Sequence, residues 1–294
     1  MKKTIKILTG LLTSLLVLSS IVWQSSQSLE LKIYFFNIGQ GDGMLIRTPT
    51  HENIVIDGGP DNSFLSKLGQ TLPFYDRTID LMVLTHPHAD HLTGLIPVLE
   101  RYKVKRVLTT GVVYQSSAYN EWLKLVNQEQ AEVIYAQAGQ KLIFGQVEFL
   151  VMAPLKNYHG QTIAEKGGEW QASDNGGNLN NTSVVIKMIY QQNSALFAGD
   201  LEIDGEAGLL ASGQEVKADL LKVGHHGSDT ATGHKFLAKV SPKYAVIQVG
   251  QQNKFGLPDF RVINLLTRQG VKIYRNDQHG DLTLTFNGQE IIVD

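Results

Sequence analysis

From Leu29 onward the chain alternates short apolar runs with polar, glycine-rich turns. Apolar runs of about four to eight residues bounded by turn residues predict strands, whereas apolar residues spaced three and four apart predict helices. The expected strands cover residues 31–37, 44–47, 54–56, 79–85, 107–110, 147–152, 183–190, 195–198, 219–223, 244–249 and 271–274. The expected helices cover residues 96–102, 119–128 and 260–268. Strands early and late in the chain, with helices between them, indicate an α/β fold of two sheets sandwiched by helices.

Three connections between these elements carry their own signals. Residues 191–193 (Gln-Gln-Asn) are expected to close a hairpin between two of the strands, and Asn287-Gly288 predicts a type I′ hairpin turn near the end of the chain. Residues 153–181 are polar, glycine-rich and aperiodic, so we expect an exposed loop that overhangs a site.

The N-terminal segment has a different pattern from the rest. Residues 1–6 are basic, residues 7–23 are almost wholly apolar and uncharged, and residues 24–28 are polar and end in Ser-Gln-Ser. This layout predicts that residues 1–28 form a secretory signal peptide, or a retained anchor because about 17 apolar residues is the lower limit of a membrane span. The simpler alternative is a buried N-terminal helix. Lysines before the apolar run predict an extracytoplasmic location for the remainder.

The amino-acid composition excludes several kinds of catalysis and binding. The chain has 294 residues, 43% of them hydrophobic, and no cysteine, which excludes disulfides, thiolate-bound zinc and thiol catalysis. The net charge is −2, and removal of the leader with its three lysines leaves a value near −5. Such a balance excludes a protein that coats nucleic acid non-specifically.

The densest chemical signal is residues 85–91, with the sequence Thr-His-Pro-His-Ala-Asp-His, directly after an apolar run. In an extended chain His86 and His88 point the same way and can bind one ion together. Asp90 and His91 lie past the turn and can bind a second ion. Imidazole and carboxylate groups suit zinc and related divalent ions. The alternative is a solvated histidine-rich loop.

Two later strands end in further ligand types. Asp200 follows the apolar residues of one strand and can bridge two ions, or can simply cap a helix or turn. His225 and His226 follow another strand. Because adjacent residues in a turn seldom point at one atom, we expect His226 to bind metal and His225 to act on substrate as a donor or general acid. A capping turn is the alternative for this pair.

Three other polar residues stand at the ends of predicted strands. Asp57 precedes two glycines and can orient a metal-binding histidine from behind, or can be an ordinary turn residue. Asn181 and Ser183 offer an amide and a hydroxyl near the same edge, and are candidate substrate contacts. A turn at the start of a strand explains these two residues as well.

Together these motifs resemble the metallo-β-lactamase superfamily, and within it the hydrolase domain of the ComEC competence family. The resemblance covers about residues 31–286. It rests on THPHADH at 85–91 together with NIGQGDG at 37–43, DGG at 57–59, FAGD at 197–200 and KVGHHGS at 222–228. It implies an αββα sandwich of two mixed sheets over residues 29–294, with a metal site at one edge. It also implies hydrolysis by a metal-bound hydroxide, with Asp90 and His225 as catalytic residues.

The sequence departs from the family pattern at two places. The isolated third histidine of the superfamily has no equivalent between His91 and Asp200, and residues 181–183 stand in that region. A Gly-His-Pro element of the family reads Gly-Leu-Pro here, with Leu257 in place of the histidine. One ion is therefore expected to have fewer imidazole ligands, and a histidine that assists substrate binding or proton transfer is missing.

The leading hypothesis is an extracytoplasmic hydrolase with one or two divalent ions that cleaves phosphodiesters, with DNA in a competence-like process as the candidate substrate. Zinc is favoured by the number of histidines, and manganese also suits a site rich in oxygen ligands. A hydrolase of a lactam, lactone or phosphocholine-type ester is the second hypothesis. A domain that binds DNA or cell-wall polymer without cleaving it is the third. The membrane is an expected partner if the leader is retained, and no protein partner can be predicted.

Overall fold

The computed structural model describes residues 10, 13–19, 30–163 and 178–294. The predicted leader and the middle of the predicted 153–181 loop lie largely outside the described residues, so the leader's cleavage or retention stays a prediction. Residues 13–19 are helical. Among the described residues, no helix combines the length and the apolar composition needed to cross a bilayer.

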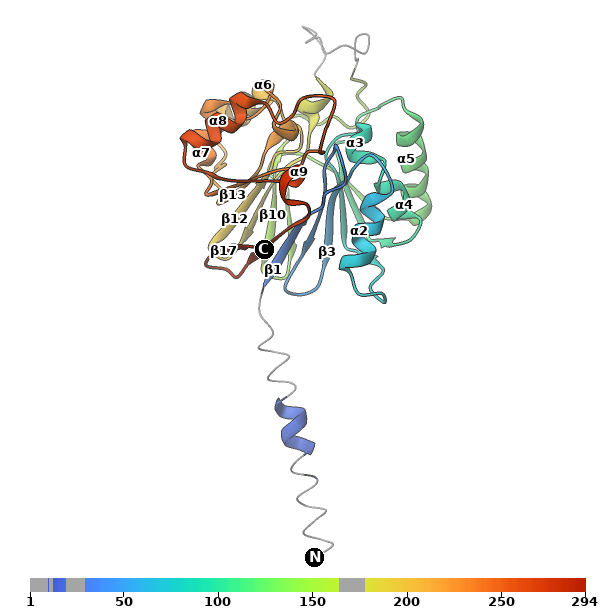
Figure 1. The fold of residues 1–294 in the computed structure, drawn as a ribbon. Helices are drawn as coiled ribbons and strands as arrows, with labels where there is room; N and C mark the ends of the chain where they lie inside the picture. The colour runs from blue at the N-terminus through green and yellow to red at the C-terminus, as the bar shows by residue number, and fades with distance from the viewer. Residues whose placement is uncertain (1–9, 11–12, 20–29, 164–177) are drawn as a thin grey trace, which may run out of the picture.

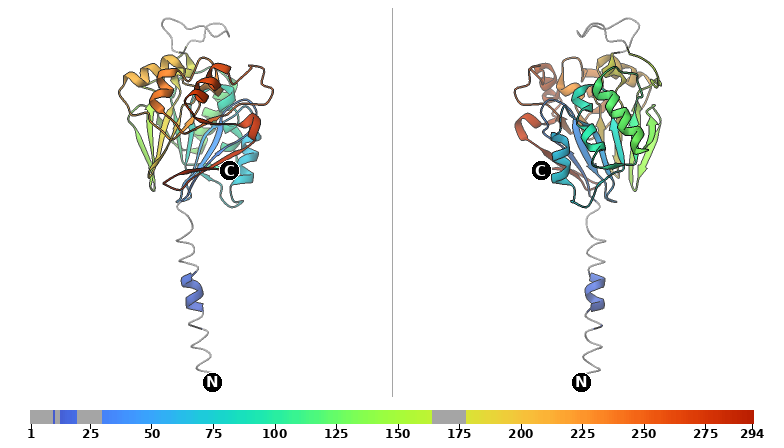
Figure 2. Two further views of the ribbon diagram at one scale, coloured as in Figure 1. Left: turned by 60° about the vertical axis from the view of Figure 1, so that its left-hand side comes forward. Right: turned by 90° about the vertical axis from the view of Figure 1, so that its right-hand side faces the viewer.

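Two large sheets face each other and carry helices on their outer surfaces, as Figures 1 and 2 show. Among the described residues, eight strands form the first sheet and seven form the second. In spatial order the first sheet is β17 (Ile291–Val293), β16 (Leu282–Phe286), β1 (Leu31–Phe35), β2 (Gly43–Arg47), β3 (Asn53–Gly58), β5 (Leu81–Leu84), β7 (Arg106–Thr109) and β8 (Glu132–Tyr135). The second is β15 (Lys272–Arg275), β14 (Tyr244–Ile247), β13 (Leu220–Lys222), β12 (Asn193–Phe197), β11 (Val185–Tyr190), β10 (Val147–Ala153) and β9 (Lys141–Phe144).

Helices on both outer faces complete the predicted αββα sandwich. The first sheet carries α2 (Ser63–Thr71), α3 (Ala89–Leu92), α4 (Leu95–Leu99) and α5 (Ser117–Glu129). The second carries α6 (Ile203–Ala211), α7 (His234–Val240) and α8 (Phe260–Arg268). The remaining short elements are the strand pair β4 (Thr78–Ile79) and β6 (Lys103–Val104), α9 (Asn276–His279), and the 3₁₀ turns η1 (Leu179–Thr182) and η2 (Gly224–Gly227). The fold class predicted from the sequence is confirmed.

Burial patterns explain why these segments form strands and helices. β3 and β5 are buried along their whole length because one sheet face packs on helices and the other on the second sheet. On α5, Tyr119, Trp122 and Val126 form one buried face, and the hydroxyl of Ser116 caps the helix by accepting from the Tyr119 N–H at 3.0 Å. The sandwich interior is apolar, with Phe35 and Phe197 packed across it.

Parallel pairing brings the site segments to one edge. β3, β5 and β7 run parallel in the first sheet, and β12, β13 and β14 run parallel in the second. The carboxyl ends of parallel strands lie at the same edge of a sheet, which is where α/β proteins usually build binding sites. The predicted ligands follow these ends.

The closing hairpin differs from its prediction. Phe286 pairs with Ile291, so the connection has four residues, 287–290, and the predicted two-residue type I′ turn is wrong. The side chain of Asn287 accepts hydrogen bonds from the N–H groups of Gln289 and Glu290, both at 2.9 Å. This side-chain turn replaces the backbone turn that Asn-Gly favours.

The lack of space around Gly94 shows how closely the helical layer approaches the first sheet. A Cβ atom at Gly94 would lie 1.9 Å from the Gly58 carbonyl oxygen and 2.6 Å from that of Asp61. Backbone atoms cannot move away cheaply, so Gly94→Ala is expected to lower the free energy of unfolding by about 1–3 kcal/mol. Urea unfolding measures this change.

The matched control is Gly69→Ala in α2, where a Cβ atom would meet nothing within 4 Å. That change is expected to raise stability by up to about 1 kcal/mol, because alanine restricts the unfolded chain and favours a helix. Equal stability of the two variants would contradict the close approach at Gly94.

Candidate metal centre

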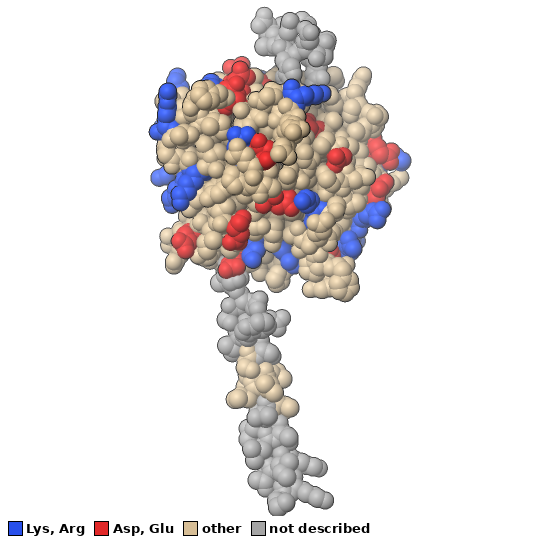
Figure 3. Space-filling model, in the orientation of Figure 1, with Lys and Arg blue, Asp and Glu red and all other residues tan. Residues whose placement is uncertain are grey.

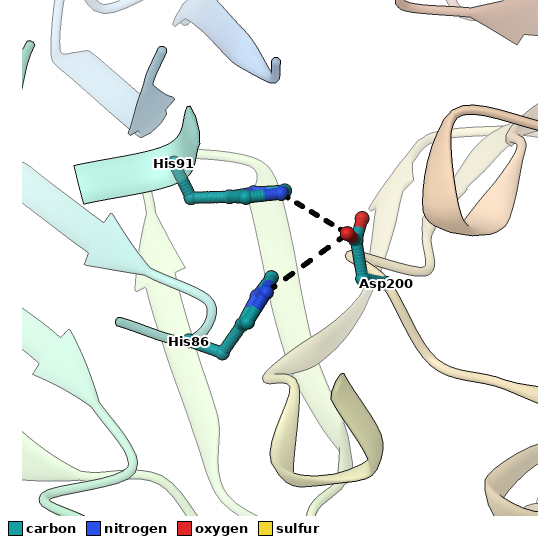
Figure 4. A group of neighbouring side chains, drawn as sticks. All are labelled: His86, His91 and Asp200. Atoms are coloured by element: carbon teal, nitrogen blue, oxygen red, sulfur yellow. Dashed lines mark hydrogen bonds and ion pairs between the residues drawn. The ribbon is translucent and has the colours of Figure 1, made fainter. Parts of the chain in front are cut away.

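Four strand ends supply the side chains of the site. Asp57 lies at the end of β3, His86 follows β5, Asp200 follows β12, and the turn η2 with His225 and His226 follows β13. Figure 4 shows the rings of His86 and His91 pointing toward the Asp200 carboxylate from the opposite sheet. The site therefore spans the seam between the two sheets.

The Asp200 carboxylate is the centre of this arrangement. Its Oδ2 lies 3.2 Å from His91 Nε2, 3.6 Å from His226 Nε2, and 3.9 Å from both His86 Nε2 and His225 Nε2. Its side chain is 3% exposed. A carboxylate oxygen that faces four imidazoles has the position expected of a bridging ligand, and the bridging role of Asp200 stays a prediction.

Two groups of ligand atoms adjoin one another and share His91. His86, His91 and Asp200 form one group, and Asp90, His91 and His226 form a second, with the ligand atoms of each group within 4.8 Å of one another. Asp90 Oδ2 lies 3.3 Å from His226 Nε2. The sequence placed Asp90 and His91 on a second ion and gave His226 as a ligand of neither ion in particular. The structure brings the three residues together, and their ligand roles stay predictions.

His88 lies beside these groups. Its Nδ1 is 2.9 Å from His86 Nε2, and the two rings meet edge to face with centroids 4.7 Å apart. The expected pairing of the two histidines on one side is present. His88 is not among the four groups that the described residues form, so its role as a ligand stays a prediction.

Asp57 holds His91 from behind. Its Oδ2 lies 2.8 Å from His91 Nδ1, and its two oxygens accept hydrogen bonds from the backbone N–H and the hydroxyl of Thr85 at 2.8 and 2.7 Å. These contacts leave the Nε2 of His91 facing Asp200. Asp57 adopts a φ of 57°, a left-handed conformation that costs energy in a non-glycine residue. The geometry matches the orienting role predicted for Asp57.

The charges of the cluster separate the histidines into two kinds. Burial and the ring of His91 hold the pKa of His86 well below its ordinary value, so His86 is neutral and its ring can offer a lone pair. Burial lowers the pKa of His91 as well, but the carboxylates of Asp200, Asp57 and Asp90 together outweigh it and hold this pKa well above the ordinary value. The same balance raises the pKa of His226 to about 10.

The donor set fits a divalent cation. The histidine rings are surrounded by three buried aspartates, Asp42, Asp57 and Asp200, and by the half-buried Asp90. Buried carboxylates need a compensating positive charge, which protons on the rings provide here and which a divalent cation can also provide. Among the described residues, Asp200 Oδ1 and His226 Nε2 are buried and make no hydrogen bond. Nitrogen and oxygen donors in this mixture suit zinc and also manganese.

Ser183 and Asn181 have partners within the protein scaffold. Ser183 is fully buried, and its hydroxyl accepts from the Asp200 N–H at 3.1 Å and lies 3.5 Å from His86 Nδ1. Asn181 Oδ1 accepts from the Glu202 N–H at 3.0 Å. Their predicted contact with substrate stays a prediction, and the structure favours a role in holding the loops that carry Asp200 and His86.

The sequence did not predict that Asp42 and Lys222 belong to the site. Both side chains are fully buried and form an ion pair, and Asp42 Oδ1 lies 3.2 Å from His226 Nδ1. Burial opposes ionisation of Asp42, but Lys222 and His226 outweigh it and hold its pKa below the ordinary value. The two residues are separated by most of the chain, so no local pattern reveals their contact. The glycines that surround Asp42 were the one available signal.

The structure also shows where the residues at the two departures from the family pattern lie. His159, the histidine between His91 and Asp200 in the sequence, stacks on Tyr135 with ring centroids 3.7 Å apart and does not join the cluster. Leu257 packs at the edge of the apolar layer over the second sheet, and its N–H donates to Asn253. Neither residue replaces the family's histidine ligand or donor.

The protein has two facing sheets with outer helices, and a buried cluster of imidazoles and carboxylates lies at their shared edge. This combination is typical of metal-dependent hydrolases with an αββα fold. The family model of the metallo-beta-lactamase superfamily matches residues 37–251, and the chain belongs to this superfamily. Members of this superfamily are typically metal-dependent hydrolases that bind one or two divalent ions.

Similar proteins include competence proteins. ComE operon protein 3 of Bacillus subtilis is 28% identical over 89% of this chain and 34% of its own length. Competence protein ComA of Neisseria gonorrhoeae is 30% identical over 73% of this chain and 30% of its own length. The chain thus spans about a third of the length of these curated relatives. The metallo-beta-lactamase fold protein YhfI of Bacillus subtilis has a TM-score of 0.55 at 13% identity, covering 87% of this chain and 99% of that one, which shows the shared fold.

Binding of a divalent ion is expected to release protons. His91 and His226 have pKa values held above neutral, and each must lose a proton before its Nε2 can bind an ion. At pH 7 we expect release of roughly one to two protons per ion, and an affinity that falls as the pH is lowered. Titration calorimetry with zinc in buffers of different ionisation enthalpy measures the release. An unchanged heat across the buffers would contradict the prediction.

Asp57→Asn is expected to weaken metal affinity about 10–100-fold, because the orienting carboxylate of His91 is lost. Competition with a chromogenic chelator measures the affinity. Asp80→Asn is the matched control, since Asp80 is also a buried aspartate that accepts a backbone N–H, at the opposite end of β5. Equal loss of affinity in both variants would show a general loss of folding instead of an effect on His91.

Proposed function

We propose that this chain is an extracytoplasmic, metal-dependent phosphodiesterase and that DNA is its substrate. The observation that carries the proposal is the pair of adjoining ligand groups that share His91, with Asp200 Oδ2 of the first group 3.6 Å from His226 Nε2 of the second. Two ions side by side can stabilise both the attacking and the leaving oxygen of an in-line displacement at phosphorus. A phosphodiester presents its leaving ester oxygen and a charged phosphoryl group to such a centre, and water supplies the attacking oxygen.

The residues divide into holding and positioning roles. His86, His88 and Asp200 would hold one ion, and Asp90, His91, His226 and Asp200 the other. Bound ions supply Lewis acidity, which polarises the phosphoryl oxygen and lowers the pKa of water. Asp57 fixes the ring of His91 through its Nδ1. His225, whose side chain is 12% exposed at the rim, is placed to exchange a proton with the substrate.

The choice of DNA rests on the relatives. Two proteins similar to this chain are named for competence, the uptake of DNA by cells. Because this chain spans only about a third of their length, the activity and substrates of the whole relatives are carried over here as a proposal. The extracytoplasmic location rests on the charge and hydropathy pattern of residues 1–28, which would also tether the protein to the membrane if retained.

The distribution of charge on the surface supports a small substrate as the second candidate. Figure 3 shows a face on which basic and acidic side chains are interspersed, with neither sign forming a continuous surface. The whole chain has a net charge of −2. Binding to long DNA usually involves neutralisation of several phosphates by lysine and arginine. A lactam, lactone or phosphocholine-type ester needs no such surface.

The test uses the full chain, purified in mild detergent, stripped of metal and reloaded with zinc or manganese. We expect restored cleavage of single- or double-stranded DNA and of bis-p-nitrophenyl phosphate. Asp90→Ala is expected to lower kcat at least about a thousandfold, because it removes a ligand on which metal catalysis depends. Asp204→Ala, at an exposed position of α6, is the matched aspartate control and should keep full activity.

The outcomes separate the hypotheses. Turnover of a chromogenic lactam without turnover of any phosphodiester would move the function to a small-substrate hydrolase. Binding of DNA or cell-wall polymer by a metal-loaded protein that cleaves none of the substrates would favour a binding domain. Full phosphodiesterase activity in Asp90→Ala would overturn the proposed mechanism.

A further inference from the structure

Glu202 lies two residues after Asp200 and joins two loops at the rim of the metal centre. Its carboxylate accepts from the side-chain amides of Asn178 and Asn180, the latter at 3.0 Å. On the other side it accepts from the Thr230 hydroxyl at 3.2 Å and lies 3.4 Å from His225 Nδ1. The side chain is 13% exposed. Glu202 thus contacts the loop before β11 and the loop after η2 at once.

Helix capping does not explain this side chain. Glu202 is the N-cap residue of α6, where a carboxylate often accepts a backbone N–H of the first turn. Here the side chain makes no capping hydrogen bond. Two acidic residues, Asp204 and Glu206, already stand in the first turn of the helix. The carboxylate of Glu202 is turned away from its own helix and toward Thr230 and His225.

The directions of the hydrogen bonds fix which nitrogen of His225 carries the proton. A carboxylate only accepts, so the Thr230 hydroxyl gives its one proton to Glu202. The Thr230 oxygen then acts as acceptor toward His225 Nδ1, which lies 2.9 Å away, and toward the Ser228 hydroxyl at 3.1 Å. With the Thr230 proton on Glu202, Nδ1 carries the hydrogen and the lone pair of the ring lies on Nε2. That nitrogen faces the metal centre, 3.9 Å from Asp200 Oδ2.

We propose that Glu202, acting through Thr230, is a positioning residue that holds His225 as the Nδ1–H tautomer with Nε2 directed at the metal centre. The arrangement follows the logic of a serine-protease triad, in which a carboxylate orients a histidine through Nδ1. A hydroxyl stands between carboxylate and ring in this case. The tautomer follows from geometry alone, whereas its use in catalysis rests on the proposed phosphodiesterase function.

In that reaction His225 moves one proton. Nε2 takes up one proton from solvent and gives it to the ester oxygen as the bond between that oxygen and phosphorus breaks. Water attacks from the opposite face of the phosphorus, and its proton passes to solvent as its oxygen forms the new bond. The products are a phosphomonoester and an alcohol, and the ring ends as it began. An alkoxide leaving group needs this proton, whereas p-nitrophenolate is stable without it.

The first test is independent of catalysis. Long-range ¹H–¹⁵N correlation spectra of the full chain, labelled with ¹⁵N-histidine and free of metal, distinguish the two ring tautomers. His225→Gln identifies the signals of His225 among the nine histidines. We expect the Nδ1–H tautomer in the parent protein, loss of that preference in Thr230→Val and Glu202→Gln, and its retention in Thr230→Ser, which keeps a hydroxyl. An Nε2–H tautomer in the parent, or an unchanged ring in Thr230→Val, would overturn the proposal.

The second test uses two leaving groups in the metal-loaded protein. For Thr230→Val and Glu202→Gln we expect kcat on a dinucleoside monophosphate to fall about 10–100-fold, with less than about threefold change on bis-p-nitrophenyl phosphate. KM and metal content should stay at the parent values, and Thr230→Ser should recover most of the loss. Equal losses on both substrates, loss of metal, or no loss at all would overturn the positioning role.

The two proposals can fail separately. If the metal-loaded parent protein cleaves neither diester, the phosphodiesterase function fails, whereas the tautomer of His225 is still decided by the spectra. If the parent protein cleaves both diesters and His225 carries its proton on Nε2, the phosphodiesterase function stands and the role of Glu202 fails.

Discussion

The burial of several carboxylates at one seam is the constraint on which the rest of this structure depends. Asp42, Asp57 and Asp200 lie almost completely out of water, where an unpaired negative charge costs several kcal/mol. Compensation comes from groups of opposite charge placed against them, the ammonium of Lys222 and the protonated ring of His226 among them. A divalent ion bound here would supply the same compensation. The buried carboxylates would therefore account both for the need for positive charge and for the binding of a metal ion.

The backbone is strained where it delivers these groups. Asp57, His225 and His226 adopt left-handed φ values of 57°, 47° and 52°. Each such conformation costs about 1–3 kcal/mol in a residue other than glycine, and persists only where the surrounding structure enforces it. The loops also pack closely at this edge, since a Cβ atom at Gly41 would lie 2.3 Å from the Asp90 carbonyl oxygen. Strain therefore gathers at the edge where the two sheets meet.

Features encoded by contiguous residues were predictable, and features made by distant contacts were not. The histidine run after a buried strand identified the ligand segment, and Asp200 was predictable because it ends another buried strand. The pairing of Asp42 with Lys222 depends on packing between two loops far apart in the sequence, so neither residue stood out. The burial of the Ser183 hydroxyl, which holds the backbone of Asp200, was not visible from the sequence either.

The paired histidines show how a local rule and tertiary packing combine. The expectation that His225 and His226 diverge follows from chain geometry, because adjacent side chains in a turn seldom reach one atom. Which ring enters the protein is decided by contacts outside the turn. His226 Nδ1 lies 3.0 Å from the carbonyl oxygen of Gln248 and is buried, whereas His225 stays at the rim beside Thr230. In the proposed function the buried ring would serve the ion and the ring at the rim the substrate, and the backbone strain is the cost of separating the two rings within one turn.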